Sequence, residues 1–355
     1  MSYSIQSYPI LDALAGGGGT LHSETLEWMK KWKGMDLDDS AKYQFTELSG
    51  STSINLRIQT VAADPKSRGS FVPRNGAANP NTEIAYFNMA AIVGWDKIYR
   101  PAARYELGPI ASAAFKKLID STRITGTQRR ENMKRILAAI ATGSPLKGAV
   151  KAKKHKSAVA LDSIATTGAS PNGAPKSSHP IIAYLQAGSS MPVAGKEQVL
   201  KTGYKGDAYE LAREYSVIMT LDSVFQQWDR YSGGNVVISN DKDGKAHFYT
   251  TDNGGADINK TSSWTERNLG WFSRYERNVI ARLRQIYDFL GNPSSGYLGY
   301  TDANEFIVDL GLYFELTPEV YVERIRRNIG LLLNKVQAVE TKYGPKAYLE
   351  LEADK

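Results

Sequence analysis

A long helical pattern runs directly into a β-hairpin in the second half of the chain. The helical pattern covers residues 207–228, and the runs NVVIS and AHFYTT follow it around an Asp-Gly turn. Asp-Gly readily adopts the positive φ angles that a tight hairpin needs. Asp229 and Asn235 stand at the entrance of this hairpin, and Asp252 stands at its exit. A hairpin needs none of these three side chains, so they require a separate explanation.

The remaining patterns indicate a strand-rich first part and a mainly helical second part. Aromatic and β-branched alternation indicates strands, and apolar residues three and four apart indicate helices. The expected elements are a helix over residues 24–33, a hairpin over 42–62, a strand in 69–76, a helix capped by Asn81 or Thr82, helices over 105–122 and 126–142, a buried strand over 181–188, and helices over 207–228, 264–290 and 318–343.

Two segments read as connections. The glycine run at residues 16–19 is typical of a flexible joint, and residues 144–180 are rich in Lys, Ala, Ser, Gly and Pro with little periodicity. We interpret the second segment as a mobile insertion whose basic run, residues 147–156, is solvated.

Composition limits the possible chemistry. The chain has 355 residues and no cysteine, which excludes disulfides and thiolate catalysis. Its net charge of +7 favours acidic partners such as nucleotide phosphates or nucleic acid. We find neither a signal-peptide pattern nor an apolar run long enough to span a membrane. The expected location is the cytoplasm, or outside the cell by export without a conventional signal peptide.

The three polar residues at the hairpin match the needs of phosphoryl transfer. A kinase uses an Asp to accept or orient the substrate hydroxyl, and an Asn and a second Asp to hold Mg²⁺ against the nucleotide phosphates. Asp229, Asn235 and Asp252 fit these roles in chain order. A calcium loop at residues 240–245 is disfavoured because the glutamate and flanking helices of an EF-hand are missing, and the four histidines have no metal-ligand spacing.

The stretches DRYSGGNVVI and YTTDNGGA resemble the catalytic and metal loops of atypical kinases, the broad group that includes phosphatidylinositol kinases, HipA-like kinases, Golgi casein kinase and spore-coat kinases. TEIAYFNMAAIVGWDKIYRP is similar to their Glu-bearing helix, and HPIIAYLQAG stands where their linker strand would be. The resemblance covers roughly residues 42–290. It implies an α+β, two-lobed protein-kinase-like fold, with a small β-rich N-lobe containing one helix and a larger, mainly helical C-lobe.

The resemblance also implies domain limits and site roles. Residues 1–40 would be an N-terminal segment with its joint, 41–180 the N-lobe with a helical extension and the insertion, and 181–355 the C-lobe. ATP would bind with Mg²⁺ or Mn²⁺. The implied roles are Asp229 as catalytic base, Asn235 and Asp252 as metal ligands, Glu83 as partner of a phosphate-binding lysine, and Ser49, Gly50, Ser51 and Thr52 as the loop over the phosphates.

Two features depart from the kinase pattern. Asp229 and Asn235 are six residues apart instead of five, and the glycines at 233–234 could absorb the extra residue. The expected lysine is missing, because the strand before the Glu helix has Val72 where it would stand. The other candidates for that role are Lys66, Arg74 and Arg57.

Three functions remain open on the sequence. The first is an ATP- and metal-dependent phosphotransferase that acts on a hydroxyl, with a protein as the favoured substrate. The second is a nucleotide-binding pseudokinase, in line with Val72. The third is a nucleic-acid-binding protein, in line with the basic run and with Tyr184 or Tyr249 available for stacking on bases.

Overall fold

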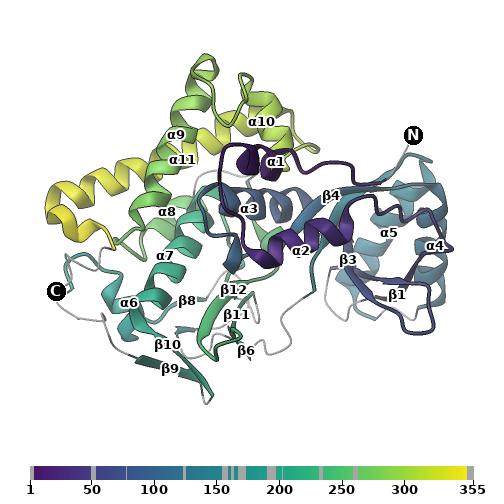
Figure 1. The fold of residues 1–355 in the computed structure, drawn as a ribbon, viewed down its shortest axis with the longest axis horizontal. Coiled ribbons are helices and arrows are strands. Elements are labelled where there is room, and N and C mark those ends of the chain that lie inside the picture. Colours follow the sequence, from purple (N-terminus) through teal and green to yellow (C-terminus); the bar gives the residue numbers. More distant parts are fainter. Residues whose placement is uncertain are drawn as a thin grey trace.

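A computed structural model of the chain describes residues 4–48, 53–76, 78–122, 125–153, 159–160, 164–166, 173–189, 197–201, 203–231, 235–258 and 263–349. A β-rich part lies at one end of the molecule and a bundle of long helices at the other (Figure 1). The expected α+β architecture is confirmed.

The β-rich part is a five-stranded antiparallel sheet with the order β1-β2-β3-β5-β4. Its strands are β1 (Tyr43–Leu48), β2 (Leu56–Thr60), β3 (Ser67–Pro73), β4 (Ala102–Leu107) and β5 (Leu146–Lys151). The expected hairpin and third strand are therefore present. An expected helix over residues 105–122 is wrong at its start, because residues up to Leu107 pair with β5, and Pro109 begins the helix instead.

Strand β5 corrects the interpretation of residues 144–180 as a mobile insertion. This strand lies between β3 and β4 and is buried from Gly148 to Lys151. Glycine is required at 148, because an added Cβ would lie 2.5 Å from the ring of Phe71. The small side chains of this segment, which read as a linker in the sequence, allow it to pack in the middle of a sheet.

Helix α3 (Pro80–Ile92) is buried along its whole length between the two parts of the molecule. Its cap is Asn79, whose side chain accepts a 3.0 Å hydrogen bond from the backbone N–H of Asn81. The predicted cap at Asn81 or Thr82 is therefore wrong by two or three residues, because Asn79 caps the helix. Helices α4 (Pro109–Ser121) and α5 (Thr127–Ala141) connect β4 to β5.

The helical part contains the predicted long helix and hairpin. Helix α7 (Ala208–Phe225) is followed by β11 (Val236–Asn240) and β12 (Ala246–Thr250), and β6 (Val159–Ala160) adds to the edge of β11. The other elements here are β7 (Ala165–Thr166), β8 (Ala174–Pro175), α6 (Pro180–Tyr184), β9 (Glu197–Lys201), β10 (Tyr204–Asp207), α8 (Ser263–Leu269), α9 (Arg277–Gly291), α10 (Ala303–Leu310) and α11 (Pro318–Tyr343).

Two predictions for this part are wrong. Residues 181–188 do not form a linker strand, because Pro180–Tyr184 is the short helix α6, whose first turn is capped by His179. The helix expected over 264–290 is two helices. The chain between them is extended enough for the N–H groups of Ser273 and Arg274 to donate to the carbonyl of Leu185.

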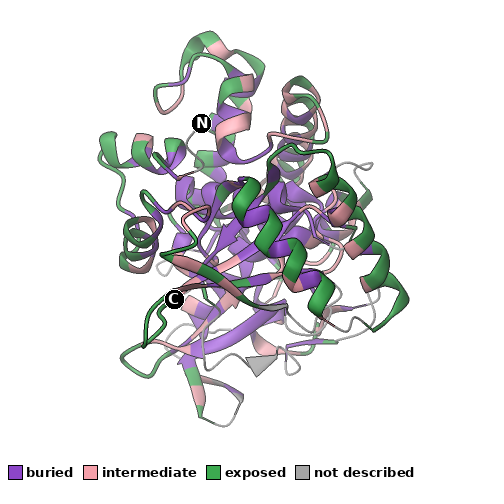
Figure 2. Ribbon diagram, turned by 90° about the vertical axis from the view of Figure 1, so that its right-hand side faces the viewer, coloured by how far each residue is buried: buried purple, intermediate pink, exposed green. Residues whose placement is uncertain are grey.

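The N-terminal segment packs against the rest of the molecule. Helix α1 (Pro9–Gly16) contacts α3 and α10, and α2 (Ser23–Trp32) follows the glycine run. That run ends α1, because the N–H of Gly19 donates to the carbonyl of Leu14 at 2.8 Å. Buried residues fill the centre of the molecule, and exposed residues lie on the outer helices (Figure 2). No helix in the described part of the chain has the length and apolar character that crossing a membrane requires.

Candidate functional site

A buried ion pair joins the sheet to α3. The ammonium of Lys151, at the end of β5, lies 2.6 Å from a carboxylate oxygen of Glu83 in the first turn of α3. The two side chains are 4% and 1% exposed, so neither charge is solvated by bulk water. Glu83 therefore pairs with a lysine in the structure, as the resemblance implied.

The lysine comes from a strand that the sequence did not identify. Val72 is buried on β3, as the sequence indicated, and the sheet places Lys151 on β5 opposite Ser70 of β3 and Ala102 of β4. The lysine that pairs with Glu83 is thus none of the three candidates named from the sequence, and the expectation that residue 151 is solvated is wrong. Protein kinases carry the lysine that pairs with the helix glutamate on the third strand of their N-lobe, whereas the lysine paired with Glu83 here lies on the neighbouring strand β5.

The other candidate cations lie elsewhere. Lys66 forms an exposed ion pair with Asp64, and Arg74 forms an ion pair with Glu315. Arg57 is exposed on β2. None of the three is paired with Glu83. The predicted phosphate loop, Ser49, Gly50, Ser51 and Thr52, lies outside the described residues and stays a prediction.

Asp229 and Asn235 are held together. The side-chain amide of Asn235 donates to the backbone carbonyl of Asp229 at 2.7 Å and lies 3.3 Å from its carboxylate. The side-chain carbonyl of Gln227 also accepts from the N–H of Asp229, at 3.0 Å. The two ends of this loop are therefore fixed to each other, and residues 232–234 between them lie outside the described part.

Arg230 organises the surroundings of these residues, a role that the sequence did not reveal. It is 2% exposed and forms a two-pronged ion pair with Asp222 of α7, at 2.9 and 2.7 Å. It also donates to the carbonyls of Asn235 and Thr251 and to the side chain of Asn253. Burial alone would lower the pKa of Arg230, but Asp222 raises it. One permanent cation therefore connects α7 to both ends of the hairpin.

The loop after β12 brings Asp252 between α3 and Asp229. The carbonyl of Gly254 accepts from the N–H of Asn79, and a Cβ added to Gly254 would lie 3.3 Å from Cγ of Glu83. A Cβ added to Gly255 would lie 3.0 Å from Cβ of Asp229. The segment from Asp252 to Gly255 therefore fills the space between Glu83 and Asp229.

The backbone and the carboxylate of Asp252 bear on its candidacy as a metal ligand. Its φ of 57° is in the left-handed region, which few residues other than glycine adopt. Among the described residues, no hydrogen-bond donor or ion-pair partner contacts its carboxylate. Asp and Asn are the residues other than glycine that adopt this region most readily, and a carboxylate without such partners could hold a cation.

A second cation lies beside Lys151. The guanidinium of Arg100, which is half-buried just before β4, donates to the carbonyl of Ala152 and to the hydroxyl of Ser70 at 3.3 Å. Burial lowers the pKa of Arg100, and the negative charges of Glu83 and Asp252 partly oppose that shift. Arg100 remains charged, because arginine does not lose its proton in proteins. No pattern in the sequence pointed to Arg100.

The site thus combines two cations on the sheet side with two carboxylates and an amide on the helical side. Cations at this position attract phosphate oxygens, and carboxylate and amide oxygens are the ligands that Mg²⁺ prefers. The arrangement suits a polyphosphate that is held from both sides, with Asp229 beside its outer end.

Comparisons with known proteins agree on the fold. No family model matches the sequence, and no curated protein matches it. Among solved structures, hydra Fam20 with sugar has a TM-score of 0.57 at 13% identity, over 93% of this chain and 93% of that chain. Golgi casein kinase has a TM-score of 0.54 at 12% identity, over 90% and 82%. The chain therefore has the two-lobed fold of these atypical kinases, as the resemblance of its motifs predicted.

Proposed function

We propose that the protein is an ATP- and divalent-metal-dependent phosphotransferase. The observation that carries the proposal is the buried ion pair of Lys151 with Glu83, at 2.6 Å, next to the loop that bears Asp252. A lysine held by a helix glutamate beside a metal-binding aspartate is the arrangement that protein kinases require for activity.

Each residue has a defined task in this proposal. Lys151 and Arg100 contact the phosphates of ATP, while Asn235 and Asp252 hold Mg²⁺ or Mn²⁺. A metal ion held there would neutralise negative charge on the phosphates. Asp229 orients the acceptor hydroxyl and takes its proton. The bond from the γ-phosphorus to the bridging oxygen breaks, a bond to the hydroxyl oxygen forms, and ADP leaves.

The donor set fits a metal that arrives with its nucleotide. Within the described residues, no group of three His, Cys, Asp or Glu side chains is placed to hold a metal ion. Mg²⁺ is usually held by one or two carboxylates together with substrate phosphates. Asp252 and Asn235 therefore need the phosphates to complete a metal site, so we expect weak metal binding without nucleotide.

A protein hydroxyl is the acceptor we propose. The support is the fold shared with Golgi casein kinase, whose name is that of a kinase acting on a protein. The sugar in the hydra Fam20 structure makes a sugar hydroxyl the other acceptor to test.

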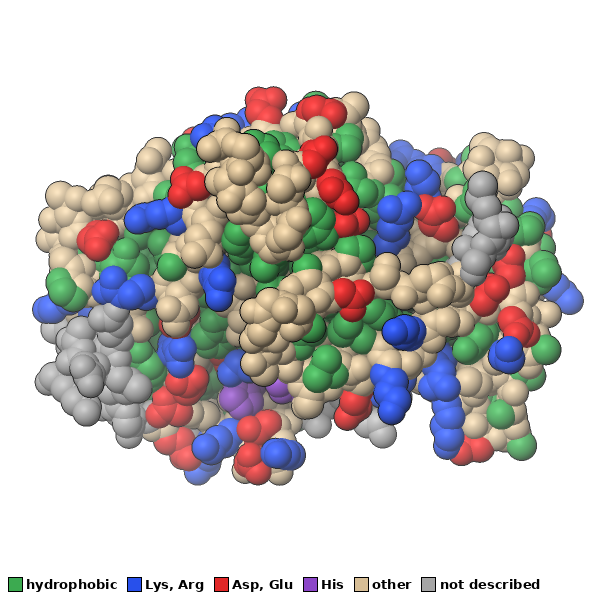
Figure 3. Space-filling view, turned by 45° about the horizontal axis from the view of Figure 1, so that its top comes forward, with side chains coloured by type: hydrophobic (Ala, Val, Ile, Leu, Met, Phe, Trp, Pro, Cys, Tyr) green, Lys and Arg blue, Asp and Glu red, His purple; other side chains and the backbone are tan. Residues whose placement is uncertain are grey.

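The two alternatives lose the features that favoured them. The pseudokinase hypothesis rested on a missing lysine, and Lys151 supplies one. The nucleic-acid hypothesis rested on the positive net charge, on the basic run and on Tyr184 or Tyr249 for stacking. Strand β5 contains part of that run, Tyr184 is only 1% exposed and Tyr249 is half-buried. Acidic and basic side chains are also interspersed on the face that Figure 3 shows.

Transfer of the γ-phosphoryl group tests the proposal. Wild type, Asp229→Asn and the control Asp243→Asn, which changes an exposed turn residue, are incubated with γ-labelled ATP, Mg²⁺ or Mn²⁺, and either casein or a mixture of sugars. We expect label transfer by wild type and the control, and a loss of about 100-fold or more in Asp229→Asn. Absence of transfer by wild type to itself and to every acceptor would contradict the proposal.

A further inference from the structure

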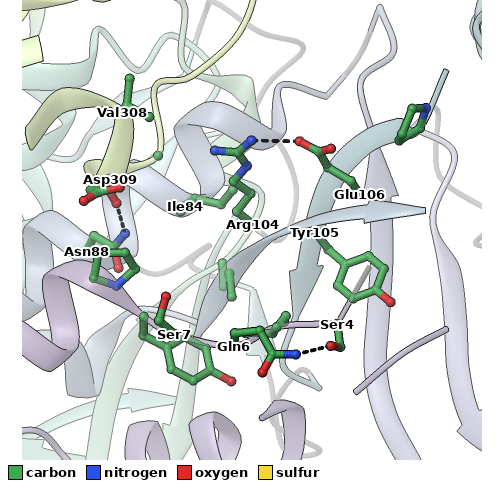
Figure 4. Close-up of a pocket in the computed structure, with 17 residues that line it drawn as sticks. Ser4, Gln6, Ser7, Ile84, Asn88, Arg104, Tyr105, Glu106, Val308 and Asp309 are labelled. Atoms are coloured by element: carbon green, nitrogen blue, oxygen red, sulfur yellow. Dashed lines mark hydrogen bonds and ion pairs between the residues drawn. The ribbon is translucent and has the colours of Figure 1, made fainter. Parts of the chain in front are cut away.

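A cavity of about 360 Å³ lies behind the ion pair of Lys151 and Glu83. Its walls come from α3, β4, the end of α10 and the N-terminal segment of residues 4–9 (Figure 4). Ile84 and Asn88 line it from α3, about 100° and 140° around the helix from Glu83. The cavity therefore opens on a different face of α3 from the one that holds the lysine, and its size is within the range of small-molecule sites.

Two side chains of this cavity, Asn88 and Asp309, have acceptor atoms that the protein uses little. The side-chain amide of Asn88 donates hydrogen bonds to the backbone carbonyls of Asp309 and Leu310, at 3.3 and 3.0 Å. Its oxygen accepts none from the described residues, although the residue is only 7% exposed. From the part of the chain that the structure describes, the carboxylate of Asp309 accepts one hydrogen bond, from Tyr300 at 2.9 Å.

The charges in the cavity do not balance. Asp309 and Glu106 contribute two carboxylates, and Arg104 contributes one guanidinium. That guanidinium is already engaged, because it bonds Glu106 at 2.8 Å and stacks on the ring of Tyr313 at 3.9 Å. Partial burial raises the pKa of Asp309, and the hydrogen bond from Tyr300 and the charge of Arg104 oppose that shift only in part. A hydrogen-bond donor with a positive charge would complete the site.

We propose that this cavity binds a small organic cation, namely a protonated amine on an apolar body, with the ammonium between Asn88 and Asp309. Apolar surface for the body of such a ligand comes from Ile84, Ala102 and Val308. An anion or a neutral molecule of the same shape would leave Asp309 unpaired.

Binding here would act on the ion pair in the cleft. Ile84 is the residue after Glu83, and Ala102 of β4 is the cross-strand partner of Lys151. The ligand therefore touches the helix that carries Glu83 and the strand that is paired with the one carrying Lys151. The cavity has its present shape while Lys151 contacts Glu83, so a ligand that fits it favours that arrangement. The ligand site stands by itself, whereas its effect on ATP binding rests on the proposed function.

The test compares three probes of one shape by isothermal titration: 2-phenylethylamine, 2-phenylethanol and phenylacetate. We expect saturable, one-to-one binding of the amine with a millimolar or tighter dissociation constant, and no saturable binding of the other two. Asp309→Asn, which keeps the size of the side chain, should weaken amine binding by about tenfold. Ser7→Trp, at an exposed residue of the cavity wall, should block it.

Three results would overturn the site: no saturable binding of the amine, equal binding of all three probes, or binding that neither variant changes. A separate measurement, made without nucleotide, examines whether amine binding in the cavity is coupled to the ion pair of Lys151 and Glu83. Glu83→Gln should weaken amine binding several-fold although Glu83 does not line the cavity, while Asp120→Asn on the exposed face of α4 should not.

Equal amine affinity in wild type and Glu83→Gln would overturn the coupling. If the amine binds and ATP does not, the proposed function fails and the cavity site survives.

Discussion

Burying the charges of Lys151 and Glu83 costs desolvation free energy, so the presence of this ion pair needs an explanation. A buried ion pair repays its desolvation poorly, and well-packed apolar residues in its place are often as stable or more so. The pair is 4% and 1% exposed. Its retention in the middle of the molecule is therefore better explained by a need for a correctly placed ammonium group than by stability.

Substitutions at Lys151 and Glu83 should therefore affect the stability of the protein and its binding of ATP differently. Lys151→Met leaves Glu83 buried and unpaired, and should lower the free energy of unfolding by about 3–5 kcal/mol. Adding Glu83→Leu should restore most of that loss, yet ATP binding should be absent from both variants. Lys147→Met, at an exposed position of the same strand, is the control and should change stability by less than about 0.5 kcal/mol.

Chemical denaturation with and without ATP and Mg²⁺ measures both quantities. A double variant no more stable than the single one, or a Lys151→Met protein that binds ATP normally, would contradict this account of the pair.

His247 on β12 should give the protein a pH-dependent stability. Its ring lies 2.6 Å from the buried carboxylate of Glu214 and 3.2 Å from Asp241, while Lys97 approaches the same Glu214 at 3.5 Å. The hydrogen bond to Glu214 is the main reason that the pKa of His247 is raised in the folded protein. A raised folded pKa means that the contribution is complete below the unfolded pKa, about 6.5, and is lost as the pH rises through the folded pKa.

The measurement is thermal unfolding of wild type and His247→Gln from about pH 5.5 to about pH 9. The difference in melting temperature should be largest at the acidic end and should shrink above the folded pKa. His22→Gln removes an exposed imidazole as the control. A difference between wild type and His247→Gln that is constant across this range would show that the charge of His247 is not involved.

At the scale of elements, the segment from Asp252 to Gly255 fits closely between α3 and Asp229, and its glycines allow the approach. Gly255→Ala would place a methyl group 3.0 Å from Cβ of Asp229, closer than most side-chain contacts. We expect phosphate transfer to fall by about 100-fold, because a displacement of about 1 Å at a reacting group has effects of this size.

The control for this change is Gly16→Ala, where an added Cβ meets no atom within 4 Å. Transfer rates and melting temperatures of both variants are compared with wild type. Normal transfer by Gly255→Ala would mean that the position of this loop relative to Asp229 is not important.

The sequence predicted the elements whose signals are local. Asp229, Asn235 and Asp252 lie within one short stretch, so a helix pattern, a turn and a strand alternation were enough to bring them together. Lys151 and Glu83 are 68 residues apart, and no local pattern connects them. The strand that carries Lys151 has small residues in a lysine-rich region, which resembles a solvated linker.

The short apolar segment at residues 180–184 shows another limit of the sequence. Periodicity cannot separate a buried strand from one and a half turns of buried helix. The prediction failed there, because His179 and Pro180 start a helix. Arg230 and Arg100 were missed because their roles depend on partners from α7, β3 and β5 that only the folded chain brings near.

At the scale of the whole molecule, the first forty residues hold the two parts together. Their helix α1 lies on α3 and α10, and further along the N–H of Leu37 donates to the hydroxyl of Tyr105 on β4 at 2.7 Å. Trp32 is 1% exposed and donates to the carbonyl of Arg68. Helix α3 is therefore enclosed by the sheet, by α7 and by the start of the chain, which fixes Glu83 toward the cleft.

The most direct test of the central claim is calorimetric titration of ATP, with and without Mg²⁺ or Mn²⁺, into wild type, Asp252→Asn and the control Asp243→Asn. We expect ATP binding that requires the metal in wild type and in the control, and loss of that binding in Asp252→Asn. No ATP binding by wild type, or binding that needs neither the metal nor Asp252, would contradict it.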